Sequence, residues 1–189
     1  RVEIPIANGK MSALGIPGIW DRLIQQCILQ VLEPICEAKF HERNNGFRPY
    51  RSTQNAIAQC YKMAQLQNLH FVVDVDIVGF FDNIDHSKLI RQLWALGIQD
   101  RKLLAIIRQM LKAEILFGDI VIEPMTGTPQ GGILSPLLAN VVLNALDWWI
   151  ANQWDTFRVK EGATGLEYDK TDSEGNLLAV DMSQKWNRL

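Results

Sequence analysis

Residues 71–86 read FVVDVDIVGFFDNIDH, and this stretch carries most of the information about the fold. Its first half, Phe71 to Ile77, has the composition of a β-strand, which would place Asp74 and Asp76 on one face and the alternate apolar residues on the other. Two carboxylates on one face repel each other unless a cation lies beside them, and oxygen ligands suit Mg²⁺. A salt bridge for one aspartate and a turn cap for the other explain a bare D-x-D pattern more often. The pattern alone therefore does not assign a metal.

Two further stretches could carry chemistry. Residues 127–140 read GTPQGGILSPLLAN, in which adjacent glycines let a ligand approach the backbone and the following helix offers free amides. A plain strand-to-helix turn explains the same pattern. Residues 46–52 read GFRPYRS, and arginines beside aromatic side chains suit the backbone and bases of a nucleic acid. An ordinary loop with solvated arginines is the alternative there.

The rest of the chain predicts an α+β fold with helices in the majority. Residues 2–7 alternate weakly and run into Asn8-Gly9, which is typical of a hairpin turn. Apolar residues repeat at helical spacing from Leu23 to Ile35, and Pro34 is expected to kink or split that helix near its end. Ser52 or Thr53 is placed to cap a helix that ends near residue 66. Further helices are expected over residues 87–96, from a cap at Asp100 onward, and over 133–152, with a short strand over 120–122.

Composition places the chain among globular proteins. It has 189 residues, 48% of them hydrophobic and 21% charged, and a net charge of −2. Residues 1–51 carry a net charge of +2 and residues 119–189 one of −5, so a phosphate-binding surface would lie toward the N-terminus. The three cysteines show no metal-binding spacing. No apolar run approaches the roughly 20 residues of a membrane helix, and the first residue, Arg1, indicates a piece of a longer protein.

Taken in order, the motifs resemble the reverse transcriptase domain of group II intron-encoded proteins, the maturases. Residues 14–17 (LGIP), followed by Asp21-Arg22, and residues 46–52 are similar to the early fingers motifs. Residues 76–86 are similar to the first aspartate motif of the palm, and residues 129–136 (PQGGILSP) to the palm motif that contacts the incoming nucleotide. The resemblance extends from about residue 2 to residue 150.

The resemblance implies a right-hand polymerase with a small antiparallel palm sheet. We expect fingers over residues 1–70, a partial palm over 71–154, and a polar insertion over 155–189 that leads to the missing second half of the palm. The implied activities are RNA-directed DNA polymerisation and maturase-assisted splicing of intron RNA. The implied partners are intron RNA, an RNA template, a DNA primer and dNTPs, without a membrane, in the bacterial cytoplasm, and a homodimer is compatible with the sequence.

The resemblance also assigns residues. Asp76, with the backbone carbonyl of Ile77, matches the position that binds catalytic Mg²⁺, whereas Asp74 matches no catalytic position. Phe81 matches the aromatic residue that excludes a ribose 2′-hydroxyl. The other expected nucleotide-binding residues are Gln130, Gly131, Lys10 and Arg22, and the expected RNA- or template-binding residues are Arg48, Arg51 and Gly132.

Three departures from the family pattern bear on activity. Ser12 and Val78 stand where the family commonly has basic residues, which weakens triphosphate and template contacts. No Tyr-x-Asp-Asp tetrad occurs before Leu189, so the Mg²⁺ site is incomplete and we expect this chain alone not to polymerise. The alternatives are a catalytically inactive relative that binds RNA, and another bacterial reverse transcriptase of the retron or phage-defence type.

Overall fold

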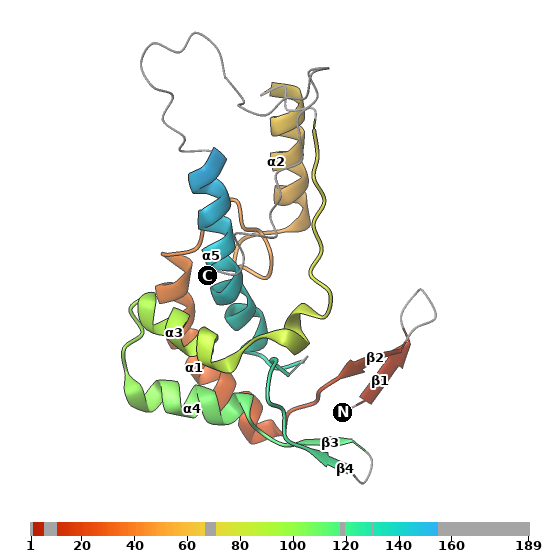
Figure 1. Cartoon of the computed structure of the whole chain (residues 1–189), viewed down its shortest axis with the longest axis vertical. Coiled ribbons are helices and arrows are strands. Elements are labelled where there is room, and N and C mark those ends of the chain that lie inside the picture. Colours follow the sequence, from red (N-terminus) through yellow and green to blue (C-terminus); the bar gives the residue numbers. More distant parts are fainter. Residues whose placement is uncertain (1, 6–10, 67–70, 118–119, 130, 155–189) are drawn as a thin grey trace, which may run out of the picture. The chain divides into compact units, whose positions relative to one another are not determined.

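The structure is a computed structural model, and it describes the chain except for residues 1, 6–10, 67–70, 118–119, 130 and 155–189 (Figure 1). The chain divides into two compact units, Arg1–Ala151 and Asn152–Leu189. Helices predominate among the described residues, and the strands form two small antiparallel sheets, which confirms the predicted α+β class. The boundary between fingers and palm at residue 70 stays a prediction.

Each sheet is a two-stranded antiparallel ribbon. Strand β1 (Val2–Pro5) pairs with β2 (Met11–Leu14), which confirms the predicted hairpin, while its Asn8-Gly9 turn lies outside the described residues. Strand β3 (Ile115–Phe117) pairs with β4 (Ile120–Ile122). Only β4 was expected, because a three-residue strand such as β3 is too short to show a period in the sequence.

The helices begin where side chains can cap them. Helix α2 (Thr53–Leu66) starts after Ser52, whose hydroxyl accepts from the Asn55 amide at 3.3 Å. Helix α3 (His86–Ala95) is capped by Asp85, and α4 (Arg101–Leu111) by Asp100, which accepts from two amides. Such caps satisfy amides that have no partner inside the helix. The predicted caps at Ser52 and Asp100 are therefore confirmed.

Two long helices complete the unit. Helix α1 (Ile19–Glu37) contains Pro34 in its last turn and is not split there. Helix α5 (Ser135–Trp154) follows the glycine-rich loop, as predicted. Among the described helices none is long and apolar enough to cross a lipid bilayer.

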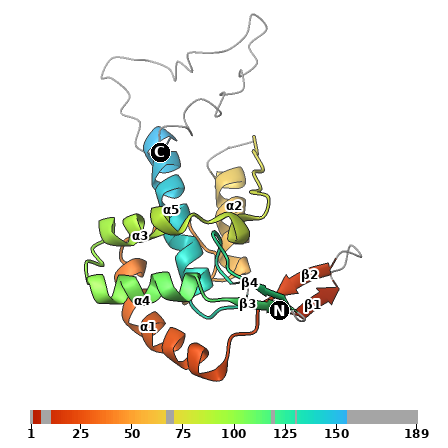
Figure 2. The ribbon, with the colours of Figure 1, turned by 60° about the horizontal axis from the view of Figure 1, so that its bottom comes forward.

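Four of the helices build the core, and α2 does not take part. Figures 1 and 2 show α1, α3, α4 and α5 gathered around one centre. Their buried apolar side chains form one cluster, which includes Leu32, Cys36, Leu89, Leu93, Ile107 and Val141. Helix α2 buries no residue. The apolar side chains of α1 that face away from the core, among them Trp20, Leu23, Ile24 and Val31, are about half to three-quarters exposed.

The predicted strand over residues 71–77 is wrong. The segment carries no strand assignment and leads from the end of α2 to a short 3-10 helix, Phe80–Asn83. Val72 and Val73 are exposed to 90% and 85% of their surfaces. Alternation in a sequence shows which residues could share a face, but a strand also needs a neighbouring strand to bond with. No described segment supplies that neighbour, so the shared face inferred for Asp74 and Asp76 is not supported.

Candidate active site

Two sequence motifs far apart in the chain are joined by hydrogen bonds at the centre of the unit. The amide of Gly127 donates to the carbonyl of Ile84 at 2.8 Å, and the amide of Thr128 donates to the carbonyl of Phe81 at 2.8 Å. The Thr126 hydroxyl adds a third bond, to the Asp82 carbonyl at 3.0 Å. The segment 126–128, which opens the glycine-rich loop, is therefore fixed on the segment 81–84, which follows the first aspartate motif.

Only glycine fits at residue 127. Its φ of +88° lies in the region that disfavours other L-residues. A Cβ built there would lie 2.8 Å from the Asp82 carbonyl oxygen and 2.9 Å from both the Asp82 Cα and the Phe81 carbonyl oxygen. All three atoms belong to the backbone, so they cannot rotate away as a side chain would. The missing side chain is therefore what allows the two motifs to touch.

His86 adds a side-chain contact to the junction. Its Nε2 lies 2.7 Å from the Gly127 carbonyl oxygen, and its side chain is buried. The ring is held at the first position of α3, directly after the Asp85 cap. The hydrogen bond from the Lys88 amide lowers the pKa of Asp85, because it stabilises the charged form of this exposed cap. The N–H and the C=O of Gly127 are thus both bonded to the 84–86 segment.

Helix α1 anchors the loop that follows. The amide of Leu134 donates to Oε1 of the buried Gln25 at 3.4 Å, and the Ser135 hydroxyl donates to the Pro129 carbonyl at 2.8 Å. A Cβ on Gly132 would lie 2.7 Å from Ser135 Oγ and 3.2 Å from Gln25 Oε1. The missing side chain of Gly132 therefore leaves room for Ser135 and Gln25, which are atoms of the protein itself. Gly131 is exposed with φ +95°, and Gln130 lies outside the described residues.

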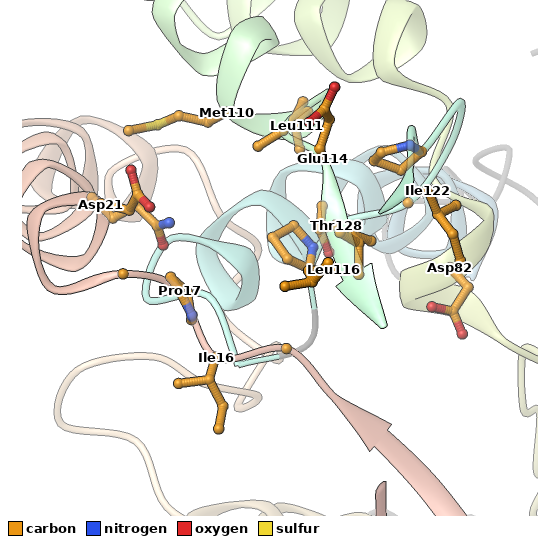
Figure 3. A pocket seen from close by; sticks show the side chains of 18 of the residues that line it. Ile16, Pro17, Asp21, Asp82, Met110, Leu111, Glu114, Leu116, Ile122 and Thr128 are labelled. Atoms are coloured by element: carbon orange, nitrogen blue, oxygen red, sulfur yellow. The ribbon is translucent and has the colours of Figure 1, made fainter. Parts of the chain in front are cut away.

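A cavity of about 510 Å³ opens beside this junction (Figure 3). Its carboxylates come from three parts of the chain: Asp21 from α1, Asp82 from the 3-10 helix, and Glu114 from the segment after α4. The remaining lining is mostly apolar and includes Ile16, Pro17, Met110, Leu111, Leu116 and Ile122. None of the predicted site residues that the structure describes lines this cavity. Its walls include parts of three of the quoted motifs, residues 14–17 with Asp21, residues 76–86 and residues 127–140, and they meet only after folding.

The predicted template residue Arg48 lies in a dense polar network. Its guanidinium pairs with the Glu37 carboxylate at 2.8 Å and donates to the carbonyls of His41 and Asn44 at 2.7 and 2.9 Å. Only 6% of its side chain is exposed, and it also lies 5.5 Å from the Phe40 ring centroid. These contacts give Arg48 a structural role in the 41–48 loop. Its assignment to template binding stays a prediction.

The same loop is fastened to α5. The Asn140 side chain donates to the Gly46 carbonyl at 2.7 Å, and the Asn44 side chain donates to the Asp147 carboxylate at 3.1 Å. The Trp148 indole donates to the Lys39 carbonyl at 3.0 Å. Burial raises the pKa of Asp147, and the Asn44 hydrogen bond opposes that shift. Helix α5 therefore connects the arginine-containing loop to the glycine-rich loop at its own N-terminus.

The second predicted template arginine, Arg51, has a different setting. It is half-buried and lines a cavity of about 370 Å³ between the loop and α2. The other lining residues are Glu42, Arg43, Gln59, Lys62 and Met63, so three cationic side chains and one carboxylate surround this space. Arg22 is exposed on α1, and Lys10 lies outside the described residues.

Comparison with known proteins identifies the family. The profile of the family described as Reverse transcriptase (RNA-dependent DNA polymerase) matches residues 4–167. The chain belongs to the reverse transcriptase family. Proteins of this family generally use divalent metal ions.

Several known proteins are similar to this reverse transcriptase chain. Protein YkfC of Escherichia coli K12 is 34% identical over 98% of the chain and 49% of its own length. The group II intron-encoded protein LtrA of Lactococcus lactis is 43% identical over 79% of the chain and 25% of its own length. A chain of a solved Cas6-RT-Cas1–Cas2 complex is 33% identical, with a TM-score of 0.47 over 74% of this chain and 24% of that one. The chain thus spans about half or less of these relatives.

The reverse transcriptase assignment makes Asp76 the central candidate, and its surroundings test whether Mg²⁺ fits. Asp76 is exposed on the extended segment before the junction, and Ile77 is 38% exposed. Among the described residues no group of three or more His, Cys, Asp or Glu side chains could hold a metal ion. Asp76 and the Ile77 carbonyl therefore offer oxygen ligands of the right chemistry but not a complete Mg²⁺ site in the part of the chain described.

Phe81 is the predicted site residue that the structure places closest to the junction. It is half-buried, and its ring packs edge-on against Phe80 with the centroids 5.7 Å apart. Its carbonyl accepts the Thr128 amide, so its backbone position is tied to the glycine-rich loop. Sequence reasoning missed the residues that make this tie, Gly127, Thr128 and His86, although all three stand inside or beside the quoted motifs.

Proposed function

We propose that the natural protein is an RNA-directed DNA polymerase, and that this chain supplies the part of its site that binds the incoming nucleotide. The observation that carries the proposal is the junction between segments 81–86 and 126–128. It bonds Phe81, the candidate that excludes a ribose 2′-hydroxyl, to Thr128, which precedes the candidates for nucleotide contact, Gln130 and Gly131, by two and three residues in the sequence. Proximity of two such elements is what positioning of a reacting nucleotide requires.

In this proposal Asp76 and the Ile77 carbonyl would hold part of a Mg²⁺ site, which when occupied would supply electrostatic stabilisation for nucleotidyl transfer. Lys10 and Arg22 contact the triphosphate, while Arg51, with the neighbouring cations of its cavity, contacts the template backbone. The substrates are dNTPs, a DNA primer and an RNA template. As in the maturases that the chain resembles, intron RNA is a second RNA partner.

Primer extension tests the polymerase proposal. The natural protein is incubated with a poly(rA) template, an oligo(dT) primer, Mg²⁺ and dTTP, and incorporation is compared between wild type and Asp76→Asn. Asp74→Asn is the matched control, because Asp74 is exposed on the same segment two residues away. We expect Asp76→Asn to lower incorporation at least a hundredfold and Asp74→Asn to retain it. Equal activity of wild type and Asp76→Asn contradicts the assignment, and we expect the 189-residue chain alone to be inactive.

RNA binding without catalysis is the second candidate function. The cationic cavity of Arg43, Arg51 and Lys62 favours it independently of Asp76, because clustered cations bind a polyanion whether or not a metal site is complete. Affinity of the chain for a structured intron RNA, measured from 50 to 200 mM salt, tests it. We expect affinity to fall steeply with salt, since each phosphate contact releases counterions. An affinity that salt does not change contradicts this candidate.

A further inference from the structure

We propose that His86 is a positioning residue, which sets dNTP selectivity by holding the Gly127 turn on the segment of Phe81. The inference rests on the proposed polymerase function and adds a residue to it. The group that acts is the Nε2–H of the imidazole, which lies 2.7 Å from the Gly127 carbonyl oxygen. His86 itself touches neither nucleotide nor metal in this proposal.

The contact defines which nitrogen of the ring carries the proton. A carbonyl oxygen only accepts, so Nε2 must donate, and the neutral ring then carries a lone pair on Nδ1. Nδ1 is buried and has no hydrogen-bond partner among the described residues. An unsatisfied buried nitrogen lowers stability, and a leucine or phenylalanine at residue 86 would avoid that loss. The cost indicates that the donor at Nε2 has a use beyond filling space.

That use is the orientation of the Gly127 turn. The Gly127 amide is bonded to Ile84, and the Thr128 amide is bonded to Phe81. Without His86, the bonds that Thr126, Gly127 and Thr128 donate to the 81–84 segment remain, but the Gly127 carbonyl oxygen loses this partner. With His86, the Gly127 C=O and the Thr128 N–H, which belong to one peptide group, are both bonded, and this restricts the orientation of the peptide plane. The next residues along the chain are Pro129 and the candidates Gln130 and Gly131.

The consequence for selectivity follows from geometry. A side chain that excludes a 2′-hydroxyl works only if the nucleotide is pressed to a constant distance from it. In this proposal Phe81 is one wall, and the segment that begins at Thr128 is the other. The bond between Thr128 and Phe81, oriented by His86, keeps the two walls at a constant separation. A looser turn lets the gap between the walls widen. The site then admits a ribose 2′-hydroxyl, and discrimination between deoxyribonucleotides and ribonucleotides falls.

Two variants separate the hydrogen bond from the volume of the ring. His86→Phe keeps an aromatic ring and removes the donor, whereas His86→Gln places an N–H at the end of a side chain of similar reach. Ile90→Ala is the control for stability alone, because Ile90 packs on the core from the same helix and its side chain has no polar atom. Each variant is first compared with wild type in a thermal melt.

Amide hydrogen exchange of the 189-residue chain tests the contact itself. We expect His86→Phe to speed exchange of the Gly127 and Thr128 amides about tenfold relative to the Ile107 amide, the change that a factor of ten in a local equilibrium produces. His86→Gln should restore slow exchange, and Ile90→Ala should not produce the local effect. Unchanged exchange at Gly127 in His86→Phe overturns the inference.

Single-nucleotide incorporation by the natural protein tests the role in selectivity. We expect His86→Phe to lower the ratio of kcat/KM for dUTP over UTP about tenfold, mainly by lowering KM for UTP, and His86→Gln to return the ratio to near the wild-type value. A variant that loses kcat equally for both nucleotides, as Ile90→Ala should if destabilised, shows a merely structural role and overturns the inference. A wild-type protein without incorporation overturns the proposed function, whereas an active wild type with unchanged selectivity in His86→Phe overturns this role alone.

Discussion

Replacing Gly127 by alanine should disrupt the junction between the two motifs. Its φ of +88° costs an alanine about 1–2 kcal/mol. The new Cβ would also lie 2.8–2.9 Å from three backbone atoms of residues 81 and 82, so the two segments must separate. Separation weakens the backbone bonds from Gly127 and Thr128, each worth about 1 kcal/mol. We therefore expect Gly127→Ala to lower the free energy of unfolding by about 3–4 kcal/mol, a large share of the roughly 5–15 kcal/mol typical of a domain.

Gly97→Ala is the matched control for this experiment. Gly97 also has a positive φ, +105°, but a Cβ built there has no atom within 4 Å. Gly97→Ala therefore incurs the conformational cost alone, about 1–2 kcal/mol, and the difference between the variants isolates the overlap at Gly127. Urea unfolding of the chain, followed by far-ultraviolet circular dichroism, measures both. If Gly127→Ala is no more destabilising than Gly97→Ala, the close contact between the motifs is refuted.

Three further outcomes test other parts of the structure. Burial raises the pKa of Cys36 to about 12, so iodoacetamide at pH 8 should label the two exposed cysteines and spare Cys36 until the chain is unfolded. Peptide mass spectrometry measures the labelling of each cysteine, and early labelling of Cys36 contradicts its burial. Burial raises the folded-state pKa of Asp147 above its ordinary 3.8, so this residue's contribution to stability is present below pH 3.8 and is lost as pH rises through the folded pKa. Asp147→Asn should therefore gain in urea midpoint relative to wild type at pH 7, with the gain shrinking as pH falls toward about 4, and a pH-independent difference would refute the assigned cause. Arg48→Met leaves the Glu37 carboxylate and two loop carbonyls without their donor, so it should lower the free energy of unfolding by about 2–4 kcal/mol in the same urea assay. A decrease of less than about 0.5 kcal/mol would show that the network does not form in solution.

Local features were readable from the sequence because they depend on a few neighbouring residues. A helix cap needs one side-chain oxygen and an amide two or three residues away, and Ser52 and Asp100 meet that condition within the chain's own first turns. The β1–β2 hairpin and the long α5 helix follow from short-range patterns in the same way. The order of the motifs was sufficient to indicate the family, which the profile match over residues 4–167 confirms.

Long-range features were not readable, because their partners are far apart in the chain. The alternation over residues 71–77 predicted a strand, yet no described segment pairs with it, and a period of two contains no information about a neighbour. Nothing in the GFRPYRS stretch indicated that folding surrounds Arg48 with Glu37 and loop carbonyls, and the same stretch is equally compatible with an arginine that faces solvent. The sign and count of charges cannot tell these two environments apart.

The candidate site shows the same division. The sequence by itself determined the residue types: a glycine at 127, a histidine at 86, an aromatic residue at 81, and an aspartate at 76. Only the tertiary structure decided that Gly127 and His86, which are 41 residues apart, share a 2.7 Å contact, and that the Phe81 carbonyl accepts from the amide of Thr128. The physical reason is that hydrogen bonds and steric fit act over a few ångströms in space, whereas a sequence pattern records only separation along the chain.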